Sequence, residues 1–235
     1  MLTSRQRLRS LVEALPTAAE RTLLLGLLSF GMTPYKALIF DLGKVVFDLS
    51  FDRVFHAWAN ASGKPAAELK AAFRFDALFD QFEIAAVTPP HFRAELSKRL
   101  GLTLTDHEFD AGWCALYLAP YPGVEALLAR LKKQYQLVAL TNTNCIHGPV
   151  WQLKYADTLR HFDYVFSSHE LHVRKPEAAA YRHVLDYLQV QPAGAVFLDD
   201  SPANVQGAAQ LGLTTILVTS YDQMSVALGT LGLLP

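Results

Sequence analysis

The chain has 235 residues, of which 51% are hydrophobic, 11% aromatic and 18% charged, a composition typical of a globular protein and not of a disordered or fibrous one. Its formal net charge is -1 and no long basic run is present, so we expect no nucleic-acid partner. Two cysteines are too few for a disulfide scaffold, and no apolar run has the length of a membrane-spanning helix, which together predict a cytoplasmic protein without a membrane partner.

Residues 1–33 are predicted to be an N-terminal extension. Several arginines precede an apolar run over residues 23–32, which two glycines and a serine interrupt. The run loosely suggests a targeting peptide, but the short charged lead and the small-residue cleavage site of a secretory signal are missing. Two other interpretations stay open: an amphipathic helix with leucines at helical spacing, or a translated leader ahead of Met32.

The rest of the chain divides into a core and an insertion. The first strand is predicted over residues 35–41, followed by a loop or small flap over residues 42–48. Residues 51–119 show helical patches and no convincing strand, which indicates a helical insertion. Strands then alternate with helices, as in parallel βαβ units. We expect a core domain formed by residues 34–50 and 120–235, with a helical cap formed by residues 51–119.

Four further core strands are predicted beyond the insertion, and helices separate them. The helix after Asp200 has the best-marked start, because Ser201 can cap it and Pro202 suits its first position. The fold class is therefore α/β, with a Rossmann-like parallel sheet core and an inserted α-helical cap. The four strands cover residues 137–140, 164–166, 195–198 and 215–218.

Polar side chains end three of the predicted strands. Asp41, Thr141 and the pair Asp199-Asp200 each follow an apolar run, and Lys175 stands before a proline between the last two motifs. Ligands of open α/β sheets bind beyond the carboxyl ends of such strands. This set of groups suits displacement at phosphorus assisted by a divalent cation. It consists of a carboxylate nucleophile, a hydroxyl group, a cation and a further pair of carboxylates.

Each of these residues also has an ordinary structural explanation. A single Asp after a strand is more often a turn former or a helix cap, and Thr commonly ends strands. Lys175 alone would be a solvated loop charge, and Asp199-Asp200 could cap the following helix. One shared site explains all four motifs better than four coincidences at the ends of strands.

The order of the motifs resembles that of the haloacid dehalogenase-like (HAD) hydrolase superfamily, capped subfamily I, over nearly all of residues 35–218. The first motif and the residues after it look closest to bacterial α-glucose-1-phosphate phosphatases. The resemblance implies the HAD fold and a hydrolase that uses Mg²⁺. The motifs are Phe40-Asp41-Leu42-Gly43, Leu140-Thr141-Asn142, Arg174-Lys175-Pro176 and Leu198-Asp199-Asp200-Ser201.

The resemblance gives roles to the residues that would handle phosphate. Asp41 is expected to be the nucleophile and to form an aspartyl phosphate, which divides hydrolysis into two easier steps. Lys175 is expected to act in catalysis as the cation that balances the carboxylates and the phosphate. Thr141 and Asn142 are expected to bind phosphate oxygens together with Lys175.

The resemblance also predicts a magnesium site. Mg²⁺ prefers oxygen ligands, and Asp41, Asp200 and the main-chain carbonyl of Gly43 would supply them, with Asp199 in support. The superfamily commonly has a second aspartate at the Gly43 position, where it shuttles a proton to and from the leaving oxygen. Since such a group contributes about 10²- to 10⁴-fold in rate, its absence predicts a slower phosphatase.

Two further predictions concern residues of the flap and the cap. Lys44 and Arg53 are candidates for anion contacts, against the simpler interpretation of surface charge. The aromatic residues of the cap are expected to form its core and not a sugar-stacking platform. These residues are Trp58, Phe73, Phe75, Phe79, Phe82 and Trp113.

The function predicted from the sequence is a Mg²⁺-dependent phosphatase of a small phosphorylated metabolite, with a sugar phosphate as the expected substrate. A metal-independent 2-haloacid dehalogenase is one alternative, since Gly43 is compatible with it, although the crowded charge of Asp199 and Asp200 makes better sense around a cation. A relative without turnover that binds a phosphate ligand or a protein is the other. The sequence predicts no oligomeric state.

Overall fold

The computed structural model describes residues 35–234, so the predicted extension over residues 1–33 lies outside the described residues. Residues Tyr35–Ser225 form one compact unit, called the first unit below, to which residues 226–234 do not belong. The sheet, the helical insertion and the pocket all belong to the first unit.

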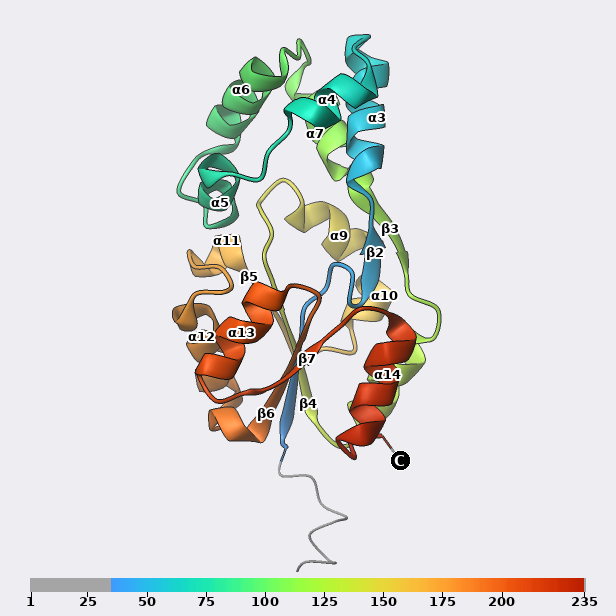
Figure 1. Cartoon of the computed structure of the whole chain (residues 1–235), viewed down its shortest axis with the longest axis vertical. Coiled ribbons are helices and arrows are strands. Elements are labelled where there is room, and N and C mark those ends of the chain that lie inside the picture. The colour runs from blue at the N-terminus through green and yellow to red at the C-terminus, as the bar shows by residue number, and fades with distance from the viewer. Residues whose placement is uncertain (1–34, 235) are drawn as a thin grey trace, which may run out of the picture. The chain divides into compact units, whose positions relative to one another are not determined.

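A five-stranded parallel sheet lies at the centre of the first unit, with the strand order β5-β4-β1-β6-β7 (Figure 1). Phe40 of β1 lies opposite Ala139 of β4 on one side and Leu198 of β6 on the other. Every residue of β1 is fully buried, as in a central strand covered on both faces. The predicted α/β class is confirmed. The strands are β1 (Ala37–Phe40), β4 (Gln136–Thr141), β5 (Tyr164–Ser167), β6 (Ala195–Asp199) and β7 (Thr214–Leu217).

Helices α12 and α13 pack on one face of this sheet. Tyr181 and Val184 of α12 and Ala208 of α13 share a buried cluster with Ile39 of β1 and Phe197 of β6. None of the described helices is long and apolar enough to cross a membrane. The helical segments after the insertion are α8 (Val124–Leu131), α9 (Gly148–Lys154), α10 (Ala156–Leu159), α11 (Ser168–Leu171), α12 (Ala178–Leu188), the 3₁₀ turn η2 (Pro192–Gly194), α13 (Pro202–Gln210) and α14 (Tyr221–Thr230).

Residues 51–116 are helical and are called the insert below. Trp58 stacks on Trp113 with ring centroids 5.7 Å apart, and its indole N–H donates a hydrogen bond of 3.0 Å to the carbonyl of Phe109. The helical character is as predicted, whereas a separate cap domain bounded at residues 51 and 119 stays a prediction. The insert contains α3 (Phe51–Ser62), α4 (Ala66–Ala72), α5 (Ala77–Glu83), α6 (Pro89–Leu100), α7 (Asp106–Trp113) and the 3₁₀ turn η1 (Cys114–Leu116).

Two short strands connect the insert to the core and were not predicted. β2 (Phe47–Leu49) and β3 (Tyr117–Pro120) pair in antiparallel fashion, with Leu49 opposite Tyr117. The sequence pattern assigned β2 to a loop or flap and gave no strand for β3, because runs of three or four residues are too short to show periodicity. Their partners are distant in the chain, so only tertiary folding brings them together.

Candidate active site

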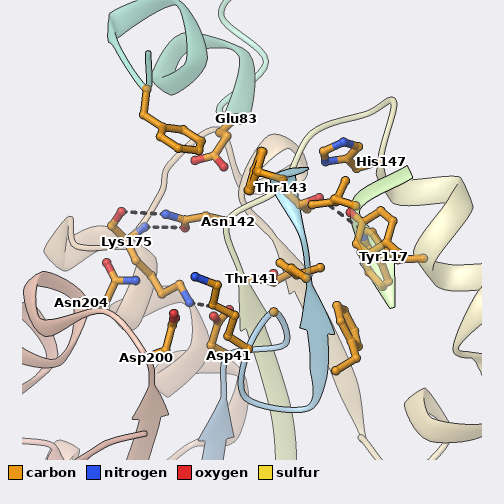
Figure 2. Close-up of a pocket in the computed structure, with 18 of the residues that line it drawn as sticks. Asp41, Glu83, Tyr117, Thr141, Asn142, Thr143, His147, Lys175, Asp200 and Asn204 are labelled. Carbon is orange, nitrogen blue, oxygen red and sulfur yellow. Dashed lines mark hydrogen bonds and ion pairs between the residues drawn. The ribbon is translucent and has the colours of Figure 1, made fainter. Parts of the chain in front are cut away.

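The carboxyl ends of three neighbouring strands bring the predicted motifs together. Asp41 follows β1, Thr141 is the last residue of β4, and Asp199 is the last residue of β6. Because β4, β1 and β6 are adjacent in the sheet, these residues meet at one edge. Lys175 reaches the same place from the loop between α11 and α12 (Figure 2).

Lys175 is the centre of the charged cluster. Its side chain is 1% exposed, and its Nζ lies 2.8 Å from Asp41 Oδ1 and 2.6 Å from Asp199 Oδ2. Burial lowers the pKa of Lys175, but the carboxylates of Asp199 and Asp41 outweigh burial and raise it above its usual range. The ammonium group therefore keeps its charge and is a fixed positive centre at the end of the sheet.

Asp41 is buried beside Lys175, with only 8% of its surface exposed. Burial raises the pKa of Asp41 to about 7; Lys175 opposes this shift, and Asp199 and Asp200 add to it. A carboxylate that is desolvated and crowded by other carboxylates gains stability as an anion when a further positive charge arrives. The surroundings of Asp41 are therefore suited to a cationic partner.

Asp199 and Asp200 are adjacent in sequence but differ in what they contact. Asp199 is fully buried and accepts hydrogen bonds from Lys175 Nζ, from the Ser201 N–H at 2.8 Å, and from Asn204 Nδ2 at 3.0 and 3.1 Å. Asp200 is half-buried and lines the pocket, and burial followed by the charge of Asp199 raises its pKa. Asp199 thus positions Lys175, and Asp200 is the carboxylate of the pair that faces the pocket.

The three aspartates form a cluster that fits a divalent cation. Ligand oxygens of Asp41, Asp199 and Asp200 all lie within 4.8 Å of one another. Lys175 offsets one of the three negative charges, and a small divalent ion with oxygen ligands would offset the other two. Since the oxygens of Asp199 already accept several hydrogen bonds, Asp41 and Asp200 are the carboxylates that would hold the ion. Gly43 lines the same pocket.

Asn142 contacts the main chain of Lys175 in the loop between α11 and α12. Its Nδ2 donates a 2.9 Å hydrogen bond to the carbonyl of Lys175, and its Oδ1 accepts one of 2.9 Å from the Lys175 N–H. The side chain therefore positions Lys175, and a contact of Asn142 with phosphate would come from its main-chain N–H or from the second hydrogen of Nδ2. Thr141 is buried at the end of β4 and lines the pocket, as a phosphate contact requires.

A cavity of about 220 Å³ lies above the cluster, and its lining changes in character from one end to the other. Lys44 lines it with its backbone in the left-handed region, at a φ of 58°, whereas Arg53 is not among the lining residues. The charged end is formed by Asp41, Gly43, Lys44, Thr141, Asn142, Lys175, Asp200 and Asn204. The remaining wall is formed by Phe47, Leu49, Phe51, Phe75, Phe79, Glu83, Leu116, Tyr117, Thr143, His147 and Trp151 (Figure 2).

Two ionisable residues of this wall were not singled out from the sequence. Glu83 ends α5 and is 5% exposed; burial raises its pKa to about 7 against the opposing effect of Arg174, whose Nε donates a 2.9 Å hydrogen bond to Glu83 Oε2. His147 is buried, and burial lowers its pKa to about 4. Neither residue stands in a motif, so no sequence signal marked them.

The prediction that the aromatic residues form the core of the insert is wrong for Phe75. Phe75 is 60% exposed, and both Phe75 and the half-buried Phe79 line the pocket. Both lie close to the start of α5, where the insert faces the cavity. The prediction is confirmed for the buried residues Trp58, Phe73, Phe82 and Trp113.

The match to a family model agrees with this geometry. Residues 35–212 match the model described as haloacid dehalogenase-like hydrolase. The chain therefore belongs to the haloacid dehalogenase-like hydrolase family, as the order of its motifs predicts.

Three relatives illustrate the similarity. The chain is 22% identical over 187 residues to D-ribitol-5-phosphate phosphatase of Bacteroides thetaiotaomicron, a match that covers 77% of this chain and 90% of that protein. A HAD family enzyme of the same organism, solved in complex with magnesium and inorganic phosphate, is 26% identical with a TM-score of 0.68, covering 80% of this chain and 96% of that one. Bifunctional epoxide hydrolase 2 of Sus scrofa is 33% identical over 106 residues, which are 43% of this chain and 19% of that longer protein.

Proposed function

We propose that this protein is a Mg²⁺-dependent phosphatase that hydrolyses a small phosphomonoester through an aspartyl phosphate on Asp41. The observation that carries the proposal is the buried ion pair between Asp41 and Lys175 at the end of the central strand, with Asp200 facing the pocket. The similarity to a sugar-alcohol phosphatase and to an enzyme solved with magnesium and phosphate supports it.

In the first step a carboxylate oxygen of Asp41 forms a bond to phosphorus while the ester P–O bond breaks, and the alcohol leaves with a proton. In the second step a water oxygen forms a bond to phosphorus while the bond between phosphorus and the Asp41 oxygen breaks; inorganic phosphate leaves, one proton of the water passes to solvent, and the Asp41 carboxylate is restored. Lys175 holds a positive charge beside the reacting oxygen throughout, and Thr141 donates to a phosphate oxygen. A bound Mg²⁺, held by Asp41, Asp200 and the Gly43 carbonyl, would supply further charge neutralisation.

The proton of the leaving alcohol needs a source other than the usual aspartate. Gly43 stands at that position, and its missing side chain leaves water or another group of the pocket to protonate the alcohol. Because a positioned acid contributes about 10²- to 10⁴-fold, we expect slow turnover of esters whose alcohol leaves poorly.

The 2-haloacid dehalogenase that the sequence left open is the second candidate. Its substrate would bring another carboxylate to a site that already holds Asp41, Asp199 and Asp200 around one lysine. Like charges at such distances repel strongly away from water, so this arrangement favours a phosphate ester bound together with a divalent cation.

The test is inorganic phosphate release from a panel of sugar phosphates and simpler phosphate esters, with Mg²⁺ or with EDTA. We expect release by the wild type only with Mg²⁺, and loss of release in Asp41→Asn. The matched control is Asp186→Asn, an exposed aspartate of α12 outside the pocket lining, which should behave as wild type. Release that persists in Asp41→Asn, or chloride release from 2-chloropropionate in EDTA, would overturn the proposal.

A further inference from the structure

The insert contributes an almost entirely apolar surface to the cavity. Aromatic side chains are its largest part, and strand β2 adds two more apolar residues beside them. Apolar walls of a cavity favour apolar ligands, because contact releases water from both surfaces. The residues that the insert supplies are Phe51, Phe75, Phe79, Glu83 and Leu116, and those from β2 are Phe47 and Leu49.

Phe75 is the unusual member of this wall. Its ring is 60% exposed in the segment between α4 and α5, although it packs edge-on against Phe51 at 5.0 Å and against Phe79 at 4.9 Å between ring centroids. Phe51 and Phe75 also border a neighbouring hollow of about 500 Å³, whose lining combines apolar residues such as Phe55 and Phe73 with charged residues such as Lys70 and Arg74. An exposed aromatic residue at the rim of a pocket is typical of a ligand contact.

The polar groups in the same wall are already paired within the protein. The hydroxyl of Thr143 accepts a 3.2 Å hydrogen bond from Trp151 Nε1. Both ring nitrogens of His147 have partners, at 3.0 and 3.2 Å. These groups have little capacity left for the hydroxyls of a ligand.

Glu83 is the ionisable group that the insert presents to the cavity. Arg174 already holds its Oε2 through contacts of 2.9 Å from two guanidinium nitrogens. One carboxylate oxygen remains, which serves one ligand hydroxyl but not the several hydroxyls of a sugar or polyol. Hydroxyls that lose water and find no partner weaken binding.

From these observations we infer that the substrate is a phosphomonoester whose alcohol carries an aromatic or apolar group, bound against Phe51, Phe75 and Phe79. The inference rests on the proposed function and adds the substrate class to it. The phosphate would lie at the charged end of the pocket, and the alcohol would extend along the insert. This substrate class differs from the sugar phosphate that the sequence predicts, and the two stand as competing proposals.

The experiment compares three esters of primary alcohols: benzyl phosphate, cyclohexylmethyl phosphate and glucose 6-phosphate. All carry a ring joined through one methylene to the phosphate oxygen, and they differ in flatness and in hydroxyl content. We expect kcat/KM for benzyl and cyclohexylmethyl phosphate to exceed that for glucose 6-phosphate at least about tenfold. Equal or faster hydrolysis of glucose 6-phosphate would overturn the inference and leave the proposed function standing.

The failure of the proposed function gives a different result. If the protein were not a phosphatase, none of the three esters would release phosphate with Mg²⁺, and Asp41→Asn would change nothing. Such an outcome would overturn both the function and the substrate class.

A variant of the wall provides the second readout. Phe75→Ala removes a mostly exposed ring, so the fold should persist, which thermal unfolding checks. We expect it to lower the ratio of kcat/KM between benzyl and glucose 6-phosphate at least about threefold, mainly through KM, and Phe75→Trp to restore the ratio. The matched control is Tyr187→Ala, a ring 48% exposed on α12 and outside the pocket lining, which should keep the wild-type ratio. An unchanged ratio in Phe75→Ala would contradict the inference.

Discussion

At the charged end of the pocket, ion pairs and hydrogen bonds hold the side chains of Asp41, Asn142 and Lys175, whereas at the insert end aromatic rings pack on one another and Phe75 is exposed. Lys175 is fixed by Asp41 and Asp199, and Asn142 fixes its main chain. Phe75 has only its neighbouring rings. The difference indicates that the charged end is fixed by contacts at the carboxyl edge of the sheet, whereas a single substitution such as Phe75→Ala can change the insert end.

The two ends meet at Gly43 and Leu49. A Cβ atom added at Gly43 would lie 2.6 Å from Leu49 Cδ1, so an apolar residue of the wall fills the space that a side chain at this position would need. The absence of an acid/base side chain at position 43 and the apolar wall are therefore connected, because Leu49 of the wall fills the space that such a side chain would occupy.

The largest effect is expected from Lys175→Met. It removes the shared cation and leaves two buried carboxylates facing each other, so we expect phosphate release to fall about 10³-fold and the free energy of unfolding to fall by about 3 to 5 kcal/mol. Phosphate assays and urea unfolding measure the two effects. The matched control is Lys132→Met, because Lys132 pairs with Asp163 at the surface and its loss should cost less than about 1 kcal/mol. Equal stability of the two variants would show that the charged end is not held as described.

Asp200→Asn and Asp199→Asn should separate the roles of the two adjacent carboxylates. We expect Asp200→Asn to raise the Mg²⁺ concentration for half-maximal activity by about 10- to 100-fold, because it removes a ligand that faces the pocket. Asp199→Asn should instead lower stability, since Lys175 loses one of its partners. Magnesium titrations and urea unfolding of both variants check this, and the reverse assignment of the two effects would contradict it.

Placing an acid at the junction of the two ends should speed turnover. We expect Gly43→Asp combined with Leu49→Ala to raise kcat on esters with poor leaving groups about tenfold or more, because the aspartate can protonate the leaving oxygen and the smaller residue makes room. Steady-state kinetics measure this gain. The pair Gly43→Asn and Leu49→Ala is the control, since it has the same shape without the proton; an equal gain there would rule out acid catalysis.

An effect on stability smaller than that of Lys175→Met is expected at Glu83, which lies where the insert meets the core. Burial raises its pKa to about 7 in the folded protein, so its ionised form is disfavoured there, and the stability it contributes falls as pH rises from about 4.5 to about 7. Glu83→Gln should therefore gain stability relative to wild type between pH 5 and pH 8, by about 1 to 3 kcal/mol at about 1.4 kcal/mol per pKa unit. Urea unfolding at both pH values measures it. Glu68→Gln, an exposed position on α4, should show no such gain, and a pH-independent difference at Glu83 would refute the prediction.

The sheet and the charged end were predictable because both depend on local patterns. Apolar runs such as residues 37–40 and 195–198 mark buried parallel strands, and a polar residue at the end of such a strand must lie at the carboxyl edge. The strand pattern therefore places Asp41, Thr141 and Asp199 at the carboxyl ends of their strands. The order of the strands in the sheet then brings the three residues together.

The other contacts of the site depend on long-range packing, which leaves no local signal. Glu83 and Phe82 are adjacent residues of one helix and are both buried, but only the carboxylate lines the pocket. Phe73 and Phe75 are two residues apart, yet one is buried in the insert and the other lies at the rim. The short strands β2 and β3 likewise exist only as a pair.

Sequence alone was enough to indicate the α/β class, the helical insertion, the order of the motifs and the family. The reason is that buried strands and motifs are both recognised from short runs of consecutive residues. The three-dimensional fold was needed to distinguish Asp199, which holds Lys175, from Asp200, which faces the pocket, and to place Glu83 and Phe75 in the wall. The physical reason is that an apolar or charged side chain takes its role from what it packs against, and those neighbours come from distant parts of the chain.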